Sequence, residues 1–472
     1  MLRRNPATLR LILQPKTWKL LAYWRKAIPL RQMLALMGLV LLQISSGCGG
    51  GSGTSVNIQT APAVAISPTS PSMGVGANLQ FSATISGASS TAVNWQVNGS
   101  QGGSASTGTI DTAGLYIAPA PAPASGTVTI TAVSQADTTQ SATTTVTLLP
   151  TDPLGAVTSS STVSCPGVTT IGTPPSTSAC YSLNVSCPYV TDFTAYLKVN
   201  KPAGTAIGTV IFGTGGGGPT LYDSTWQYGI NVIETVLDAG FNTVQVAYGG
   251  PFNNNATPNG WLTGPGGVRR LACRYATVAQ WAYQNIHQSN AQAPFCATGN
   301  SGGSAMITYA MTDYGLDSIF AFVEPTSGPP FARLDYACIG NGTPLATPCG
   351  QGVEPLTYSP ADAAIVDPAY AAPICSEAMG GNTANQAQLL SDSVDGPGAN
   401  YSYPNTAVNI MFGGLDNSVA VPQGMEWWLS QKSSSNSPSA PACVADAPHE
   451  MPSVLDAAEL IASDMVSMCK LQ

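Results

Sequence analysis

The feature that most constrains this chain is a serine framed by glycines, the run Gly-Asn-Ser-Gly-Gly at positions 299–303. An apolar segment precedes this run and a helix-like segment follows it. Gly-x-Ser-x-Gly between a strand and a helix is typical of a nucleophile elbow, a sharp turn that exposes the hydroxyl of Ser301 while the glycines let neighbouring backbone approach. Because 49 of the 472 residues are glycine, the motif also arises by chance, and its meaning depends on the rest of the chain.

An acid that could serve Ser301 lies further along the chain. Asp416 ends the apolar strand candidate 408–415 and precedes a helix-like stretch over 421–432. In that position it could also simply cap the helix. Glu324, which follows a short apolar segment, is the alternative acid. We take Asp416 as the acid, and Glu324 stays open beside it.

Only two histidines could act as the base. His449 follows a second short strand candidate that begins at position 442. His287 lies between a predicted helix over 271–286 and the strand that leads to Ser301, hence at the amino end of that strand and at the wrong edge of the sheet. We therefore take His449 as the base and expect His287 to be solvated.

A serine, an acid and a histidine in this chain order resemble the α/β-hydrolase superfamily, in its secreted serine esterase and polyester depolymerase branches, over about 156–472. The resemblance implies that Ser301 is the nucleophile, His449 the general base and then acid, and Asp416 the group that orients the imidazole. It implies hydrolysis of carboxylic esters through an acyl-enzyme, with no metal or cofactor. The alternatives are a polyester depolymerase or a serine peptidase on the same scaffold, and a surface adhesion protein without activity.

The same resemblance implies an oxyanion hole made of two backbone amides. The amide that follows the nucleophile belongs to Gly302. The second is expected in the glycine-rich run after the strand candidate 208–213, which lacks the histidine of the His-Gly-Gly-Gly version of this loop. This run is also typical of a plain flexible turn, so three donors stay open: Thr214, Gly215 and Gly216.

The first 47 residues resemble an export signal. Residues 1–32 hold eight basic residues and no acid, and the apolar stretch 33–44 is shorter than a membrane-spanning helix. Small residues then precede Cys48, as in a bacterial lipoprotein signal. We expect a protein anchored by a lipid on Cys48 to the cell envelope membrane, with simple cleavage and release, or an uncleaved anchor, as the alternatives.

Charge and cysteine content fit an exported chain. Eight of the 16 basic residues lie in the leader, so the remainder sets eight basic residues against 24 acidic ones, a formal charge near −16 that excludes a nucleic-acid partner. Ten cysteines follow Cys48, and we expect all of them in disulfides. The pairs considered are Cys180 with Cys187, Cys338 with Cys349, and Cys443 with Cys469.

Two folded parts follow a glycine-rich tether at 48–62. Short alternating segments with frequent turns over 63–150 resemble a bacterial immunoglobulin-like β-sandwich, with Trp95 in its core rather than serving as a carbohydrate platform. Strand and helix patterns then alternate over 151–472, which predicts a doubly wound, mostly parallel α/β sheet. The alternation fails over about 327–405, where we expect a cap insertion that selects the substrate. Trp261 and five tyrosines of the insertion are the candidates to contact substrate: Tyr336, Tyr358, Tyr370, Tyr401 and Tyr403.

Overall fold

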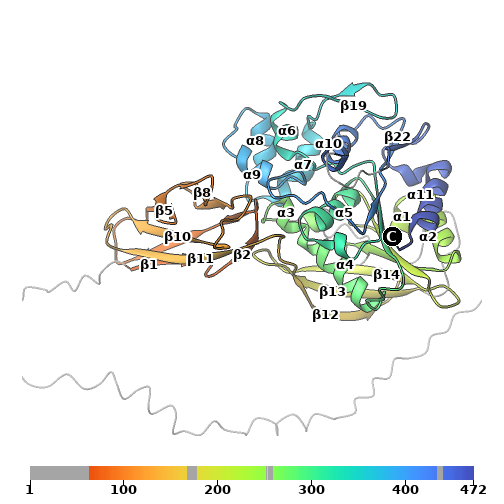
Figure 1. The fold of residues 1–472 in the computed structure, drawn as a ribbon, viewed down its shortest axis with the longest axis horizontal. Coiled ribbons are helices and arrows are strands. Elements are labelled where there is room, and N and C mark those ends of the chain that lie inside the picture. The colour runs from red at the N-terminus through yellow and green to blue at the C-terminus, as the bar shows by residue number, and fades with distance from the viewer. Residues whose placement is uncertain (1–62, 167–177, 251, 253–258, 433–438, 472) are drawn as a thin grey trace, which may run out of the picture. The chain divides into compact units, whose positions relative to one another are not determined.

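The protein is described here by a computed structural model that covers residues 63–166, 178–250, 252, 259–432 and 439–471 (Figure 1). The predicted export signal, Cys48 and the tether lie outside the described residues. Within the described residues, no helix combines the length and the apolar character needed to cross a membrane.

Residues 63–149 form an all-β unit. Its core contains Phe81, Trp95 and Tyr116, so Trp95 lies inside as expected. Buried residues from both larger sheets share this core, which makes the unit a sandwich. One sheet has the order β2 (Ser72–Gly74), β11 (Ser141–Leu149), β10 (Thr127–Ser134), β5 (Val93–Val97) and β6 (Ser100–Gln101), the other β3 (Asn78–Gln80), β9 (Leu115–Ile117), β8 (Gly108–Ile110) and β7 (Gly103–Ser104), and β1 (Ala63–Ser67) pairs with β4 (Ser82–Ser86).

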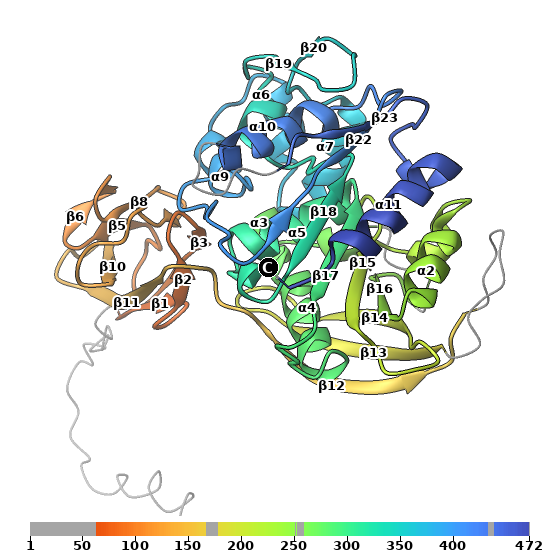
Figure 2. The ribbon, with the colours of Figure 1, turned by 45° about the vertical axis from the view of Figure 1, so that its right-hand side comes forward.

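The rest of the chain is built on one ten-stranded sheet, antiparallel from β12 to β16 and parallel from there to its last strand (Figure 2). The parallel part confirms the predicted α/β class. Its order is β12 (Ala156–Val163), β13 (Ala179–Ser186), β14 (Phe193–Asn200), β16 (Phe241–Ala247), β15 (Gly208–Gly213), β17 (Phe295–Asn300), β18 (Phe322–Thr326), β22 (Met411–Gly413) and β23 (Ala442–Val444), with β21 (Ala407–Val408) also paired to β18.

Helices cover both faces of this sheet because its central strands are apolar on both sides. On β15, Val210 and Phe212 pack in one core and Ile211 packs in the other. The first core includes α2 (Gly229–Asp238) and α11 (Leu455–Met468). The second contains residues of three longer helices: α4 (Cys273–Asn285), α5 (Gly302–Thr312) and α10 (Ala420–Lys432). The short helices α1 (Tyr222–Thr225) and α3 (Val268–Leu271) lie in the connections.

The segment between β18 and β21 contains only short elements, which Figure 1 shows gathered beside α10. This is the stretch in which the sequence predicts an insertion. Its capping box, in which Ser359 and Asp362 bond reciprocally, starts one helix in the usual way. The elements are α6 (Leu334–Ile339), β19 (Leu345–Ala346), β20 (Val353–Glu354), α7 (Pro360–Val366), the 3-10 helix η3 (Asp367–Ala369), α8 (Ile374–Met379) and α9 (Gln386–Ser391).

All ten cysteines after Cys48 form disulfides, but the pairs suggested by sequence spacing are wrong. Cys180 lies near the start of β13 and Cys187 directly follows its last residue, so the extended strand holds them about 23 Å apart, far beyond the reach of a disulfide. Five such bonds are typical of an oxidising compartment. The pairs are Cys165–Cys180, Cys187–Cys273, Cys296–Cys469, Cys338–Cys375 and Cys349–Cys443.

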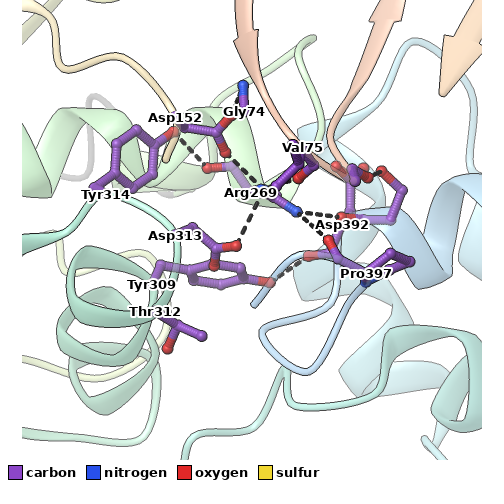
Figure 3. A network of polar contacts seen from close by, with 12 residues as sticks. Gly74, Val75, Asp152, Arg269, Tyr309, Thr312, Asp313, Tyr314, Asp392 and Pro397 are labelled. Carbon is purple, nitrogen blue, oxygen red and sulfur yellow. Dashed lines mark hydrogen bonds and ion pairs between the residues drawn. The ribbon is translucent and has the colours of Figure 1, made fainter. Parts of the chain in front are cut away.

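A buried arginine joins the sandwich to the α/β domain (Figure 3). The guanidinium of Arg269 contacts the carboxylates of Asp152 at 2.6 Å and Asp313 at 3.2 Å. It also donates hydrogen bonds to two backbone carbonyls, that of Val75 in the sandwich at 3.1 Å and that of Pro397 in the insertion at 3.3 Å. One side chain therefore connects three parts of the chain.

Candidate active site

Ser301 stands on a strained turn between β17 and α5. Its φ of 56° and ψ of −118° are rarely adopted by residues other than glycine, and its backbone N–H donates to the carbonyl of Thr326 on β18 at 2.9 Å. The neighbouring glycines are required by space. A Cβ on Gly302 would lie 1.9 Å from the backbone oxygen of Gly216. The turn therefore has the geometry of a nucleophile elbow.

Asp416 and His449 meet beyond the carboxyl ends of two later parallel strands. Asp416 follows β22, His449 follows β23, and Nδ1 of His449 lies 2.9 Å from Oδ2 of Asp416. Ser418 contacts both, since its N–H donates to Oδ1 of Asp416 at 2.9 Å and its Oγ lies 3.0 Å from Nδ1 of His449. The sequence order predicts the first pair but gives no sign of Ser418.

The two partners stabilise each other's charged forms. Burial acts to raise the pKa of Asp416, but the hydrogen bonds and charge of His449, together with Ser418, outweigh it and hold that pKa below its usual value. Burial acts to lower the pKa of His449, and the hydrogen bond and charge of Asp416 outweigh it, so the pKa of His449 is raised. An imidazolium that forms here is therefore favoured.

Asn300, the variable residue inside the motif, holds the histidine loop in place. Its Nδ2 donates to the carbonyl of His449 at 3.0 Å. Its Oδ1 accepts from the N–H of Met451 at 3.3 Å and from the hydroxyl of Thr326 at 2.9 Å. The sequence does not reveal this role, because the partners lie about 25 and 150 positions away.

Glu324 lies inside β18 rather than after it, and its side chain is fully buried. Its Oε2 accepts a hydrogen bond from Asn409 at 2.7 Å, and it shares a hydrogen bond with Asp464. Burial, followed by the contact with Asp464, raises the pKa of Glu324 well above its usual value. The structure thus brings Asp416 and not Glu324 to His449.

The expectation that His287 is solvated is wrong. Its side chain is buried, with Nδ1 3.1 Å from the hydroxyl of Thr209 and Nε2 close to the carbonyls of Asn290 and Ala293 at 3.0 and 3.1 Å. Burial lowers its pKa. These contacts make His287 a structural residue that ties the loop after α4 to β15.

Ser301 and His449 line one cavity of about 210 Å³. Gly302 and Gly216 line it too, whereas Thr214 and Gly215, the other expected oxyanion donors, do not. Ser301 and His449 are both among the described residues, and no hydrogen bond joins their side chains. In enzymes with such a pair, the hydrogen bond between nucleophile and base often forms only when substrate binds. The remaining walls come from the insertion and the start of α10: Pro330, Phe331, Tyr358, Asp362, Ile365, Ser418, Val419 and Ala420.

Of the aromatic candidates, only Tyr358 lines this cavity. Trp261 is fully buried and packs against Tyr309 and Phe331, so it supports the wall from behind. Its place on a glycine-rich loop predicts that Trp261 lines the pocket, but its ring packs against Phe331, and Phe331 lines the cavity instead. Among the described residues, no three His, Cys, Asp or Glu side chains are grouped so that they could hold a metal ion.

Comparisons with known proteins give structural similarity alone. No family model matches the sequence, and no curated protein matches it. Carboxyl esterase 2 of the mycorrhizal fungus Tuber melanosporum is 12% identical with a TM-score of 0.39, over 64% of this chain and 87% of that one. A Pyrobaculum calidifontis esterase is 11% identical with a TM-score of 0.39, over 62% of this chain and 84% of that one. A bacterial heroin esterase is 13% identical with a TM-score of 0.36, over 61% of this chain and 83% of that one.

The class of fold follows from the chain itself. A mostly parallel sheet carries an elbow serine at the carboxyl end of β17, and an acid and a histidine follow later strands of the same sheet. This is the arrangement of an α/β-hydrolase fold. Within that class, the side chains at the expected three positions are those of Ser301, Asp416 and His449.

Proposed function

We propose that this protein is a serine hydrolase that cleaves carboxylic esters through an acyl-enzyme intermediate. The observation that carries the proposal is the strained Ser301 in one cavity with His449, whose Nδ1 lies 2.9 Å from the buried carboxylate of Asp416. Serine becomes a nucleophile only when a base can take its proton, and this arrangement supplies an oriented base.

In the proposed reaction, His449 takes the hydroxyl proton as Oγ of Ser301 attacks the ester carbonyl carbon. The amides of Gly302 and Gly216 are the proposed donors to the resulting oxyanion, since both glycines line the cavity. His449 then protonates the leaving alcohol, and water attacks the acyl-enzyme by the same route in reverse order. Asp416 stabilises the imidazolium in both halves.

The deciding experiment is covalent labelling with a fluorophosphonate, combined with turnover of short chromogenic esters. Wild type should be labelled on Ser301, and Ser301→Ala should lose at least about three orders of magnitude in kcat while unfolding at the same temperature. Ser318→Ala, at an exposed serine, is the matched control. Labelling of another residue would remove Ser301 from the mechanism. An anilide and a solid polyester in the same assay test the peptidase and depolymerase alternatives.

We also propose that the protein acts outside the cytoplasm, held by a lipid on Cys48. The five disulfides support the oxidising location, and the anchor rests on the sequence alone. The anchored protein should enter the detergent phase on phase separation, and Cys48→Ala should move it to the aqueous phase. If the partition is unchanged, the anchor is wrong and the esterase proposal is unaffected.

A further inference from the structure

The candidate active-site cavity contains an isolated acidic side chain outside the triad. Asp362 lines it beside Ser301 and His449, and none of the twelve residues that line it is a lysine or arginine. The reaction described above does not use Asp362. Asp362 therefore contributes an acidic side chain to the wall of the space in which a substrate would lie, and His449 is the one side chain among these twelve that can carry a positive charge.

The position of this carboxylate is fixed by the start of α7. Oδ2 of Asp362 accepts hydrogen bonds from the N–H of Ser359 at 2.8 Å and from its hydroxyl at 2.6 Å. These bonds restrict the position of the carboxylate. A charge held in this way acts on a bound substrate without first having to be oriented.

Other carboxylates around His449 have the same sign. Besides its partner Asp416, both Glu450 and Asp362 act on the imidazole electrostatically, and each favours its protonated form. Arg333, which belongs to the same insertion, is already paired with Asp335 at 2.7 Å and lies 3.7 Å from Glu426. Apart from His449, the charged groups named around the cavity are thus carboxylates or an arginine that is paired with carboxylates.

We propose that Asp362 makes this site selective for charge, so that esters with a cationic group near the scissile bond are preferred and those with a carboxylate are disfavoured. The proposal rests on the esterase function proposed above. In a cavity of about 210 Å³, any bound group lies close to both Asp362 and Ser301. Asp362 is partly exposed, so its attraction or repulsion is screened by water and corresponds to about tenfold in kcat/KM.

The same charge has a consequence for product release. Hydrolysis consumes the ester and one water and yields the alcohol and a carboxylic acid, which loses its proton at neutral pH. The carboxylate of the product lies in the same cavity as Asp362, and the two negative charges repel each other. The ester group from which it forms is neutral and is not repelled by Asp362. The site therefore binds its acid product more weakly than its substrate.

Pairs of esters with the same shape and different charge test this selectivity. The ester acetylcholine and 3,3-dimethylbutyl acetate differ only in the replacement of nitrogen by carbon. The methyl ester of trimethylglycine and methyl 3,3-dimethylbutanoate differ in the same way. Acid release is followed for each pair, with monomethyl succinate as the anionic ester. We expect a cationic preference of about tenfold in at least one pair, falling as salt is raised.

Asp362→Asn should bring the cationic-to-neutral ratio of kcat/KM to about one within each pair, and this ratio is the readout because any change in the reactivity of His449 affects both esters of a pair alike. The amide oxygen can still accept from Ser359. Asp367→Asn is the matched control, since Asp367 also bonds to a helix start, at Cys375, but does not line the cavity. The proposal is overturned if neither pair discriminates, or if Asp362→Asn keeps the discrimination. If no ester is hydrolysed at all, the proposed function fails instead.

Discussion

At the scale of residues, the candidate triad is held by neighbours that come from elsewhere in the chain. Asn300 fixes the carbonyl of His449, and Ser418 contacts both His449 and Asp416. Hydrogen bonds of this kind orient a catalytic imidazole and select its tautomer. A catalytic histidine that is restrained from both sides needs little reorganisation when Ser301 reacts.

The two acids that the sequence leaves open should have different effects. Asp416→Asn removes the charge that stabilises an imidazolium on His449, so we expect kcat to fall by about three to four orders of magnitude at unchanged fold. Glu324→Gln, at a site bonded to Asn409, should change kcat by less than about threefold. Steady-state kinetics and thermal unfolding of both variants measure this. The reverse ranking would assign the catalytic acid to Glu324.

The raised pKa of His449 sets the sign of the pH dependence. A general base must be unprotonated, so kcat/KM should fall as the pH drops through the pKa of His449, with a midpoint above the ordinary 6.5. Glu450 contributes to the increase and is exposed, so Glu450→Gln should lower this midpoint, most clearly at low salt. Glu459→Gln, at another exposed acid, serves as the control and should leave the midpoint in place. A midpoint below 6.5 in wild type would contradict the assignment.

The sequence predicts the three main residues because chain order and the scarcity of histidine leave few choices. It does not predict the roles of Ser418 and Asn300, because these roles depend on contacts between segments that are distant in the chain. The environment of His287 was missed for the same reason. Its contact with the hydroxyl of Thr209, 78 positions earlier, depends on the packing of the loop after α4 against β15.

At the scale of elements, one small hairpin of the insertion reaches Asp416, the acid of the candidate triad. Strands β19 and β20 flank Cys349 and Gln351, and Cys349 is bonded to Cys443 on β23. Nε2 of Gln351 donates to the carbonyls of Gly413 at 2.8 Å and Asp416 at 3.2 Å. The hairpin thus fixes the turn that presents the carboxylate.

Loss of this contact should affect catalysis more than substrate binding. Gln351→Ala removes two hydrogen bonds to the turn, together worth about 1–3 kcal/mol, so we expect kcat to fall about tenfold with KM nearly unchanged. Gln386→Ala, at an exposed position of α9, is the control. Measurement of kcat and KM separately decides the matter. A change in KM alone would instead mean that the hairpin contacts substrate.

Regular elements were predictable where their patterns are long. The expected helix over 421–432 is α10, and the expected strand over 208–213 is β15. The pieces of the insertion were not predictable, since α6, α8 and α9 have six residues each and show too little periodicity. The disulfide pairs depend on which of these pieces pack together, and spacing along the chain does not contain that information.

At the scale of the whole molecule, the sandwich is attached to the α/β domain by buried polar contacts. The N–H of Gly74 donates to Asp152 at 2.8 Å, and the carbonyl of Gly76 accepts from Ser391 at 2.7 Å. Asn78 donates to Asp392 at 2.9 Å. The bonds to Ser391 and Asp392 connect the sandwich to the end of α9, in the insertion that lines the candidate cavity, and Arg269 adds a bond to Val75 (Figure 3). A spacer without a fixed position would not need buried contacts of this kind.

Two glycines of the sandwich allow a matched test of this attachment. Both have positive φ, 71° at Gly76 and 80° at Gly99, so alanine imposes a similar backbone strain of about 1–2 kcal/mol at each. A Cβ on Gly76 would lie 1.7 Å from the carbonyl oxygen of Pro397, whereas a Cβ on Gly99 meets nothing within 4 Å. Gly76→Ala should therefore separate the sandwich from the insertion, while Gly99→Ala only strains a turn.

We expect two unfolding transitions in calorimetry and lower esterase activity for Gly76→Ala, and one transition for Gly99→Ala. Equal behaviour of the two variants would show that the sandwich contributes nothing to the order of the insertion.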